Sequence, residues 1–218
     1  EKVREADLMS IIVPGLVPSM LELQQRGLVH RSIRPETVLL TRGGDVILDQ
    51  CLVGLPGFHQ PPAFEPITVQ LAQPTGRGDG IFADDVFAFA VTTLQLLTGE
   101  PPAKSLKPDE LFRQRVLSGS YDVLLRRRKF ATAIQVMFAG CLRDEEGRRW
   151  THDDLNRWMN GIFDMPRPSG GGRRATRPVI FRDKEVFSPP LLAKEIHRHP
   201  QHAMSLILDG RSQRWFHN

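Results

Sequence analysis

The sequence predicts a mainly α-helical domain with one small β-hairpin, followed by a linker and a small α+β unit. Three observations support this fold class. Apolar residues recur at helical spacing over residues 8–23 and in several later segments. Two short apolar runs, residues 38–40 and 46–48, flank a Gly-Gly-Asp turn, which is the pattern of a tight hairpin. Residues 164–178 combine Pro, Gly and Arg, a composition typical of linkers.

The first helix is expected to begin near residue 8 and to end near Gly27, a natural stop. Pro14 and Pro18 each remove an amide donor, so they should kink this helix or divide it. The hairpin follows, and then an irregular stretch rich in Pro and Gly over residues 52–79.

A long apolar helix begins after this stretch, with Asp84 as its expected N-cap. Three further helices are predicted over roughly residues 108–117, 129–142 and 151–163. The last of them opens with Thr-His-Asp-Asp, which fits the Thr-x-x-Asp capping pattern.

The chain therefore divides into a helical domain over residues 1–163, a linker over residues 164–178 and a small unit over residues 179–218. The small unit is expected to hold a hairpin near residues 179–187 and two short helices after it. A unit of about 40 residues is only marginally stable alone, because it buries little surface. We therefore expect this unit to dock on the helical domain or on a partner, as an accessory interaction element.

Four motifs occur in a fixed order along the helical domain. Residues 30–37 read His-Arg-Ser-Ile-Arg-Pro-Glu-Thr, and Asp49 follows the second strand, with Gln50 and Cys51 after it. Ala-Asp-Asp-Val-Phe-Ala-Phe-Ala-Val and Leu-Leu-Thr-Gly-Glu-Pro-Pro occupy residues 83–91 and 96–102. Cys-Leu-Arg-Asp-Glu-Glu-Gly-Arg-Arg occupies residues 141–149.

Together, these motifs resemble the large C-terminal lobe of the eukaryotic-type protein kinases, over about residues 5–163. In that family the catalytic loop reads His-Arg-Asp-Leu-Lys-Pro-Glu-Asn and is followed by a hairpin that ends in Asp-Phe-Gly. The resemblance implies a structural role for His30 and Arg31, with Asp85 holding the loop backbone. It also places Arg148 on the structural Arg near the end of the fold, opposite Gln73 in place of the family's Glu.

The residues that carry the chemistry in this family are replaced here. Ser32, Arg34 and Thr37 stand where the family has its catalytic Asp, its Lys and its metal-binding Asn. A serine is a poor base without an activating neighbour, and loss of general-base assistance typically costs ~10²–10⁴ in rate. Asp49 keeps the place of the metal-binding Asp, so Asp49 and Thr37 are the candidate contacts for ATP and Mg²⁺. Residual nucleotide binding is compatible with this set, whereas efficient phosphoryl transfer is not.

Composition excludes several other classes. The 218 residues are 40% hydrophobic and carry a formal charge of +4, enough for a core and only mildly basic. The run Arg-Arg-Arg-Lys at residues 126–129 lacks the interleaved aromatic residues of a single-strand nucleic-acid surface. The two cysteines show no metal-ligand spacing, which fits a cytoplasmic protein. The apolar stretch over residues 86–97 is too short to span a bilayer.

We therefore expect a catalytically impaired pseudokinase, similar to those of bacteria, with a regulatory or protein-binding scaffold role and a protein partner. The kinase resemblance also implies an N-terminal lobe with a Gly-rich loop, which these residues do not contain. We accordingly expect the chain to be part of a longer protein. Two alternatives stay open: an atypical ATP-dependent Ser/Thr phosphotransferase that uses Asp49, and a basic adaptor for a membrane surface or a nucleic acid.

Overall fold

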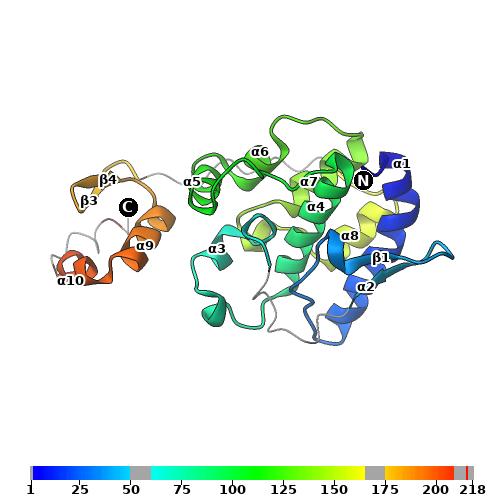
Figure 1. Cartoon of the computed structure of the whole chain (residues 1–218), viewed down its shortest axis with the longest axis horizontal. Coiled ribbons are helices and arrows are strands. Elements are labelled where there is room, and N and C mark those ends of the chain that lie inside the picture. The colour runs from blue at the N-terminus through cyan, green and yellow to red at the C-terminus, as the bar shows by residue number, and fades with distance from the viewer. Residues whose placement is uncertain (1, 50–59, 165–174, 209–214, 216–218) are drawn as a thin grey trace.

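The computed structural model describes residues 2–49, 60–164, 175–208 and 215, and within them the chain is mainly helical with two small hairpins (Figure 1). This confirms the predicted fold class. The elements are α1 (Glu5–Asp7), a π-helical turn (Leu8–Ile12), α2 (Val13–Gln25), β1 (Val38–Leu40), β2 (Val46–Leu48), α3 (Ile67–Gln70), α4 (Phe82–Thr98), α5 (Pro108–Ser118), α6 (Ser120–Leu125), α7 (Thr132–Cys141), α8 (His152–Met159), β3 (Val179–Phe181), β4 (Lys184–Val186), α9 (Pro189–Arg198) and α10 (Pro200–Leu208). Short 3₁₀ turns cover Pro35–Thr37, Pro62–Phe64, Pro74–Gly76 and Glu146–Arg148.

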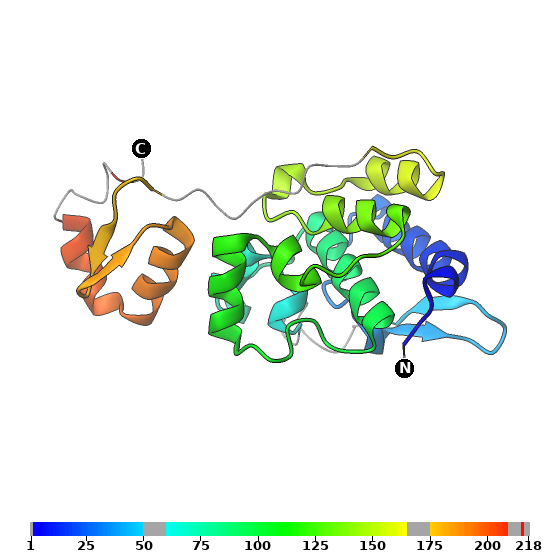
Figure 2. The same ribbon diagram turned by 90° about the horizontal axis from the view of Figure 1, so that it is seen from above.

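Helix α4 is the centre of the helical domain (Figure 2). Every residue from Asp84 to Leu94 is buried, so the helix is enclosed on all sides rather than on one face. A helix that is apolar around its whole circumference is stable only in such a position. Two carboxylates, Asp84 and Asp85, are buried in its first turn, and both hold segments distant in the sequence.

A local change of helix type precedes Pro14, the first proline of this helix. The N–H of Val13 bonds to the carbonyl of Leu8, five residues back, in a π-helical turn that comes directly before Pro14. The wider turn precedes the residue that lacks an amide donor. Pro18 lies inside α2, which nevertheless continues to Gln25.

One helical run among the described residues, Glu5–Gln25, is long and apolar enough to cross a membrane by length and composition. The apolar spacing predicts a helix over much of this run, without a membrane span. The finding is a weak indication of a membrane span, because core helices of globular domains pass the same test. Leu16, Val17 and Met20 are buried here in the main hydrophobic core.

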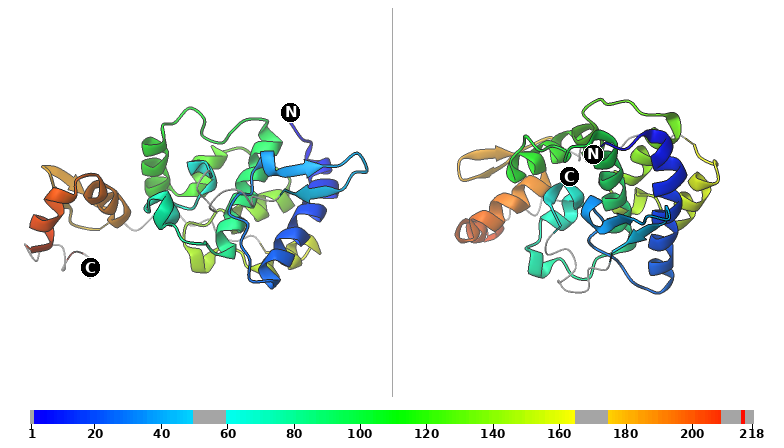
Figure 3. Two further views of the ribbon diagram at one scale, coloured as in Figure 1. Left: turned by 60° about the horizontal axis from the view of Figure 1, so that its bottom comes forward. Right: turned by 45° about the vertical axis from the view of Figure 1, so that its right-hand side comes forward.

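The hairpin β1–β2 lies beside α2 at the edge of the domain (Figure 3). Its strands are antiparallel, and Val38 pairs with Leu48. This register brings the end of β2 back beside the 3₁₀ turn that begins the hairpin, and the N–H of Asp49 donates to the carbonyl of Thr37 over 2.7 Å. The hairpin thereby fixes Asp49 next to the loop of residues 30–37.

Helices α7 and α8 close the opposite side of the core. The indole Nε1 of Trp158 in α8 donates to the carbonyl of Ala133 in α7 over 2.9 Å. Trp150 covers Gly140 of α7, where a Cβ atom would lie 2.2 Å from the indole ring. Only glycine allows this close approach, because the indole occupies the space of any larger side chain.

We expect Gly140→Ala to lower the free energy of unfolding by about 1–3 kcal/mol, since an added methyl group overpacks the Trp150 contact. Urea denaturation followed by far-ultraviolet circular dichroism measures the change. Gly147→Ala is the matched control, because a Cβ atom at Gly147 would meet no heavy atom within 4 Å. Equal stability of the two variants would show that Trp150 does not pack on Gly140.

The C-terminal unit has a small core of its own. Val179, Phe181 and Val186 from the hairpin β3–β4 enclose Leu192 of α9, and all four side chains are buried. Figure 2 shows this unit beside α5. The boundaries 1–163, 164–178 and 179–218 stay predictions.

Several element predictions need correction. Asp84 is not the N-cap of α4: Ile81 holds that position, and Asp84 Oδ2 reaches back to accept the N–H of Ile81 over 3.1 Å. The predicted helix over residues 151–163 ends at Met159. Helices α3 and α6 were not predicted, because each is too short for its apolar spacing to show. Gln50 and Cys51 lie outside the described residues.

Candidate functional site

The loop of residues 30–37 is anchored to the core by one buried carboxylate. The N–H groups of His30 and Arg31 donate to Asp85 Oδ2 and Oδ1 over 2.7 and 2.8 Å. Burial raises the pKa of Asp85, and the two backbone donors partly oppose this rise. Arg31 has φ +59°, a left-handed conformation that is unfavourable for a residue with a side chain. The paired hydrogen bonds to Asp85 hold the backbone in this conformation.

His30 is held by its two ring nitrogens. Nε2 lies 2.7 Å from the carbonyl oxygen of Asp49, and Nδ1 lies 3.3 Å from the backbone nitrogen of Ser32. A carbonyl can only accept and an amide N–H can only donate, so the tautomer with hydrogen on Nε2 satisfies both contacts. The imidazole therefore joins the loop to the end of β2, and its Nδ1 faces the backbone of Ser32.

Ser32 and Thr37 are buried inside the loop. Ser32 is 3% exposed, and its carbonyl accepts the Thr37 hydroxyl over 2.7 Å. Thr37 Oγ1 also lies 3.2 Å from the N–H of Arg34, which donates to it. The hydroxyl thus closes the 3₁₀ turn, and these internal bonds compete with any bond to a metal ion.

Asp49 lies at the open side of the site. Its side chain is exposed, and the residue borders a surface pocket of about 420 Å³ formed by α2 and β2, with Glu22 and Arg26 among the lining residues. Within the part of the chain that the structure describes, no three His, Cys, Asp or Glu side chains converge as a metal site. The protein's contribution to an Mg²⁺ site would be the single carboxylate of Asp49, which suits binding through nucleotide phosphates rather than through protein ligands alone.

Arg34 contributes charge near the loop surface. Its Nε lies 3.8 Å from Glu36 Oε2, and the side chain is partly buried. An ion pair at this distance between partly exposed groups contributes little to stability.

The side chain of Arg31 enters a buried ionic network. Its guanidinium donates to Asp84 Oδ2 over 2.7 Å and to Glu65 Oε1 over 3.4 Å. Gly80, at φ +81°, allows the backbone to pass directly over Arg31, where a Cβ atom would lie 2.2 Å from Arg31 Cδ. Arg77 lies 3.8 Å from Glu65 Oε1 and adds a second cation.

Glu65 was not among the residues found in the sequence. It is 2% exposed, and burial raises its pKa to about 7, while Arg31 and Arg77 act in the opposite direction. The sequence places Glu65 in an irregular stretch of Pro and apolar residues, which gives no sign that its carboxylate is buried. The contact with Arg31 joins this stretch to the loop.

We expect the carboxyl carbon of Glu65 to titrate in ¹³C NMR with a midpoint at about pH 7, well above its ordinary value of 4.5. Between these two values the folded state retains a proton that the unfolded state has lost. The free energy of unfolding should therefore fall as the pH rises through this window. Glu65→Gln should remove that part of the slope in urea titrations. A midpoint near 4.5 would contradict the burial of this carboxyl.

The structure corrects the assignment of Arg148. Arg148 is exposed and pairs with Glu145 over 3.0 Å, whereas Arg149 is buried. The Nη1 and Nε atoms of Arg149 donate to the carbonyls of Ala83 and Arg143 over 2.8 and 2.9 Å. The 3₁₀ turn Glu146–Arg148 rotates the chain so that the second arginine faces inward.

Gln73 does not face Arg148 either. Its side-chain nitrogen lies 2.8 Å from Nε2 of His197 in the C-terminal unit. The expected pairing was inferred from the spacing of the kinase motifs. That spacing does not determine the path of the chain between Phe64 and α4.

A third buried arginine, Arg115, contacts the chain near Pro62 and the first turns of α4. Arg115 of α5 donates through Nε to Ser120 over 2.8 Å and through Nη1 to the carbonyl of Pro62 over 3.2 Å. Burial lowers its pKa to about 10. Arg115 and Arg149 both lie against the ring of Phe87, at 5.0 and 5.3 Å from its centroid. Phe87 thereby links the two arginines to α4.

The sequence is similar, over part of its length, to a protein described as a probable kinase. The chain is similar to a probable myosin light chain kinase of Dictyostelium discoideum, with 29% identity over 128 residues. The match covers 51% of this chain and 39% of that protein, so the chain spans less than half of its relative's length. No protein-family model matches the chain. The similarity supports a kinase-like relationship at this coarse level.

Proposed function

We propose that this chain is a kinase-like module with impaired catalysis that acts as a regulatory, protein-binding scaffold. The observation that carries the proposal is the use of the loop's polar groups for internal bonds. His30 binds the backbone at both ring nitrogens, and the Thr37 hydroxyl closes its own turn. Asp85 holds the backbone of the loop, and the His30 ring and the Thr37 hydroxyl form bonds within the site.

Both ring nitrogens of His30 face backbone groups, so His30 is not placed to activate Ser32 as a nucleophile or base. Its Nδ1 is directed at the backbone N–H of Ser32. A serine hydroxyl needs an adjacent base within hydrogen-bonding reach to become reactive. Burial of Ser32 further limits access by a substrate hydroxyl. Both features support a structural role for the residue that stands at the catalytic position of the kinase motif.

Nucleotide binding is a secondary part of the proposal. The exposed carboxylate of Asp49 borders the pocket between α2 and β2 and would hold Mg²⁺ through nucleotide phosphates. Bound ATP would supply the transferable phosphoryl group, and Mg²⁺ would neutralise the charge on its phosphates. The exposed position of Asp49 at this pocket also supports a second candidate function, an atypical phosphotransferase.

A transfer assay separates these two functions. The purified full-length protein is incubated with γ-labelled ATP, Mg²⁺ or Mn²⁺ and a generic Ser/Thr acceptor. We expect transfer no greater than in the Asp49→Ala variant. Transfer that is abolished by Asp49→Ala but retained in Arg148→Ala, an exposed control, would establish the phosphotransferase instead. Thermal-shift titration with ATP and Mg²⁺ reports nucleotide binding separately.

A further inference from the structure

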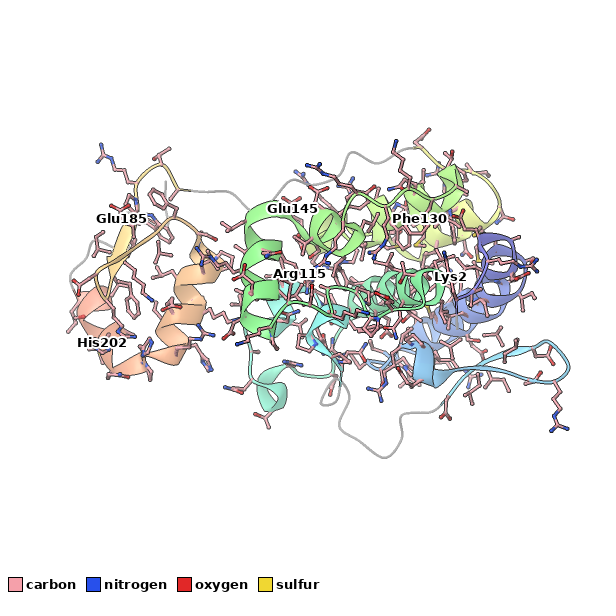
Figure 4. All side chains as sticks on the ribbon, turned by 45° about the horizontal axis from the view of Figure 1, so that its top comes forward. Lys2, Arg115, Phe130, Glu145, Glu185 and His202 are labelled. Atoms are coloured by element: carbon pink, nitrogen blue, oxygen red, sulfur yellow. The ribbon has the colours of Figure 1, made fainter. Side chains whose placement is uncertain are left out.

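Helix α9 of the C-terminal unit lies against α5 of the helical domain. Figure 4 shows α9 as the part of this unit that faces α5, on which Arg115 is labelled. Leu191 of α9 packs on the small cluster that contains Phe112 and Val116 of α5. This contact joins two segments that lie about eighty residues apart in the sequence.

Charge complementarity surrounds the apolar contact. Lys194 Nζ lies 3.0 Å from Asp109 Oδ1, and Arg198 forms a second ion pair with Asp109 Oδ2. Lys194 also lies 4.0 Å from the centroid of the Phe112 ring, within the range of a cation–π contact. The two cations hold the pKa of Asp109 below its ordinary value. One carboxylate and one aromatic ring of α5 therefore receive both cations of α9.

One side of α9 packs into the core of the C-terminal unit, and another side contacts α5. Leu192 is fully buried in the core of the C-terminal unit. Leu191, Lys194 and Arg198 follow one another at intervals of three and four residues, so they share a helix face. That face is turned toward α5 while the neighbouring side is fixed in the small unit. The small unit therefore presents a cationic amphipathic face to α5.

The contact between α9 and α5 is weak enough for another helix to replace α9. The side chains of Asp109 and Arg198 are 62% and 39% exposed, so their ion pair is solvated and worth little by itself. A groove of about 580 Å³ remains between α5 and the C-terminal unit, lined by Lys107, Glu110 and Arg113 on one side and by Lys184 and Glu195 on the other. A tethered helix occupies such a surface mainly because of its high effective concentration.

We propose that the face of α5 formed by Asp109 and Phe112 is a docking site for a cationic amphipathic helix. Helix α9 occupies the site in the free protein, and a helix of a partner protein displaces it. The partner helix carries a leucine followed by cationic residues three and seven positions later. This proposal goes beyond the scaffold function, because α5 is separate from the His30–Thr37 loop. The docking site does not depend on whether that loop transfers phosphate.

A peptide titration of the full chain tests the proposal. The probe is a fluorescein-labelled, end-capped peptide of residues 188–199, which carries the face of α9. The double variant K194E/R198E reverses the charges of the internal helix and frees α5. We expect the peptide to bind this variant at least ten times more tightly than the wild-type chain, measured by fluorescence anisotropy. The substituted side chains are exposed or partly exposed, and circular dichroism verifies the fold.

Charge reversal of the site provides the matched control. Adding D109K to K194E/R198E should weaken binding of the peptide at least ten-fold, because the introduced lysine repels the cationic peptide and pairs with the glutamates of the tethered helix. In the single variant D109K the tethered helix stays cationic and is repelled, so this variant should bind a peptide with glutamates at positions 194 and 198 at least ten times more tightly than the wild-type chain does. Hydrogen exchange of α5 should be faster in K194E/R198E than in the wild-type chain. Equal affinity for wild type and K194E/R198E, no binding to either, or no effect of D109K would each overturn the proposal.

Discussion

Replacing Asp85 by alanine is expected to lower the free energy of unfolding by about 2–6 kcal/mol. The change leaves the N–H groups of His30 and Arg31 without their acceptors in the buried loop. Each unsatisfied buried donor costs about 1–3 kcal/mol. Arg31 is also released from its left-handed conformation. Chemical denaturation in urea measures the loss at neutral pH.

Asp85→Asn separates the effect of the two hydrogen bonds from the effect of the space that the side chain fills. Asparagine keeps the size of aspartate but offers one acceptor oxygen and one donor group, so it preserves at most one of the two bonds. Its loss of stability should fall between zero and that of Asp85→Ala. Amide exchange at residues 30 and 31 should become faster in both variants. Unchanged exchange in Asp85→Ala would show that the loop does not depend on this carboxylate.

Arg149→Ala is expected to destabilise the fold by about 3–5 kcal/mol, the typical cost of removing one partner of a buried charged pair. The Arg149 side chain is fully buried, donates to the carbonyls of Ala83 and Arg143, and lies 3.8 Å from Asp84 Oδ1. Its removal leaves these acceptors unsatisfied and deprives the Asp84 carboxylate of a nearby cation. The change is read from the midpoint of urea denaturation.

The neighbouring residue supplies the control. Arg148→Ala should change stability by about 0–1 kcal/mol, because its ion pair with Glu145 is solvated. The two variants remove the same side chain from adjacent positions, so they differ only in burial and contacts. A larger effect at Arg148 than at Arg149 would restore the assignment made from the motif. Arg149→Lys should be intermediate, since an ammonium group lacks the fork that reaches two carbonyls.

Asp85, Arg31 and Arg149 together hold the loop of residues 30–37 in place. Asp85 holds the backbone, and the Arg31 side chain pairs with Asp84 and Glu65. Arg149, 66 residues later in the sequence than Ala83, donates to the Ala83 carbonyl in the first turn of α4. The fold around Ser32 and Thr37 is therefore also held by residues other than these two.

The local elements could be predicted because their signals are local. The alternation of Val38–Leu40 and Val46–Leu48 around a glycine turn predicts the hairpin, and the structure contains it. The long apolar run predicts α4. The motif also predicts that Asp85 lies near His30 and Arg31, and these residues are in contact.

The sequence by itself determined the helical fold class and the hairpin. Only the tertiary structure decided which of two adjacent arginines is buried. It also showed that Glu65 pairs with Arg31, and that Gln73 contacts His197 instead of Arg148. The physical reason is that helical and strand periodicity depends on residues a few positions apart. Burial of Glu65 and Arg149, and docking of α9 on α5, depend on how distant segments meet.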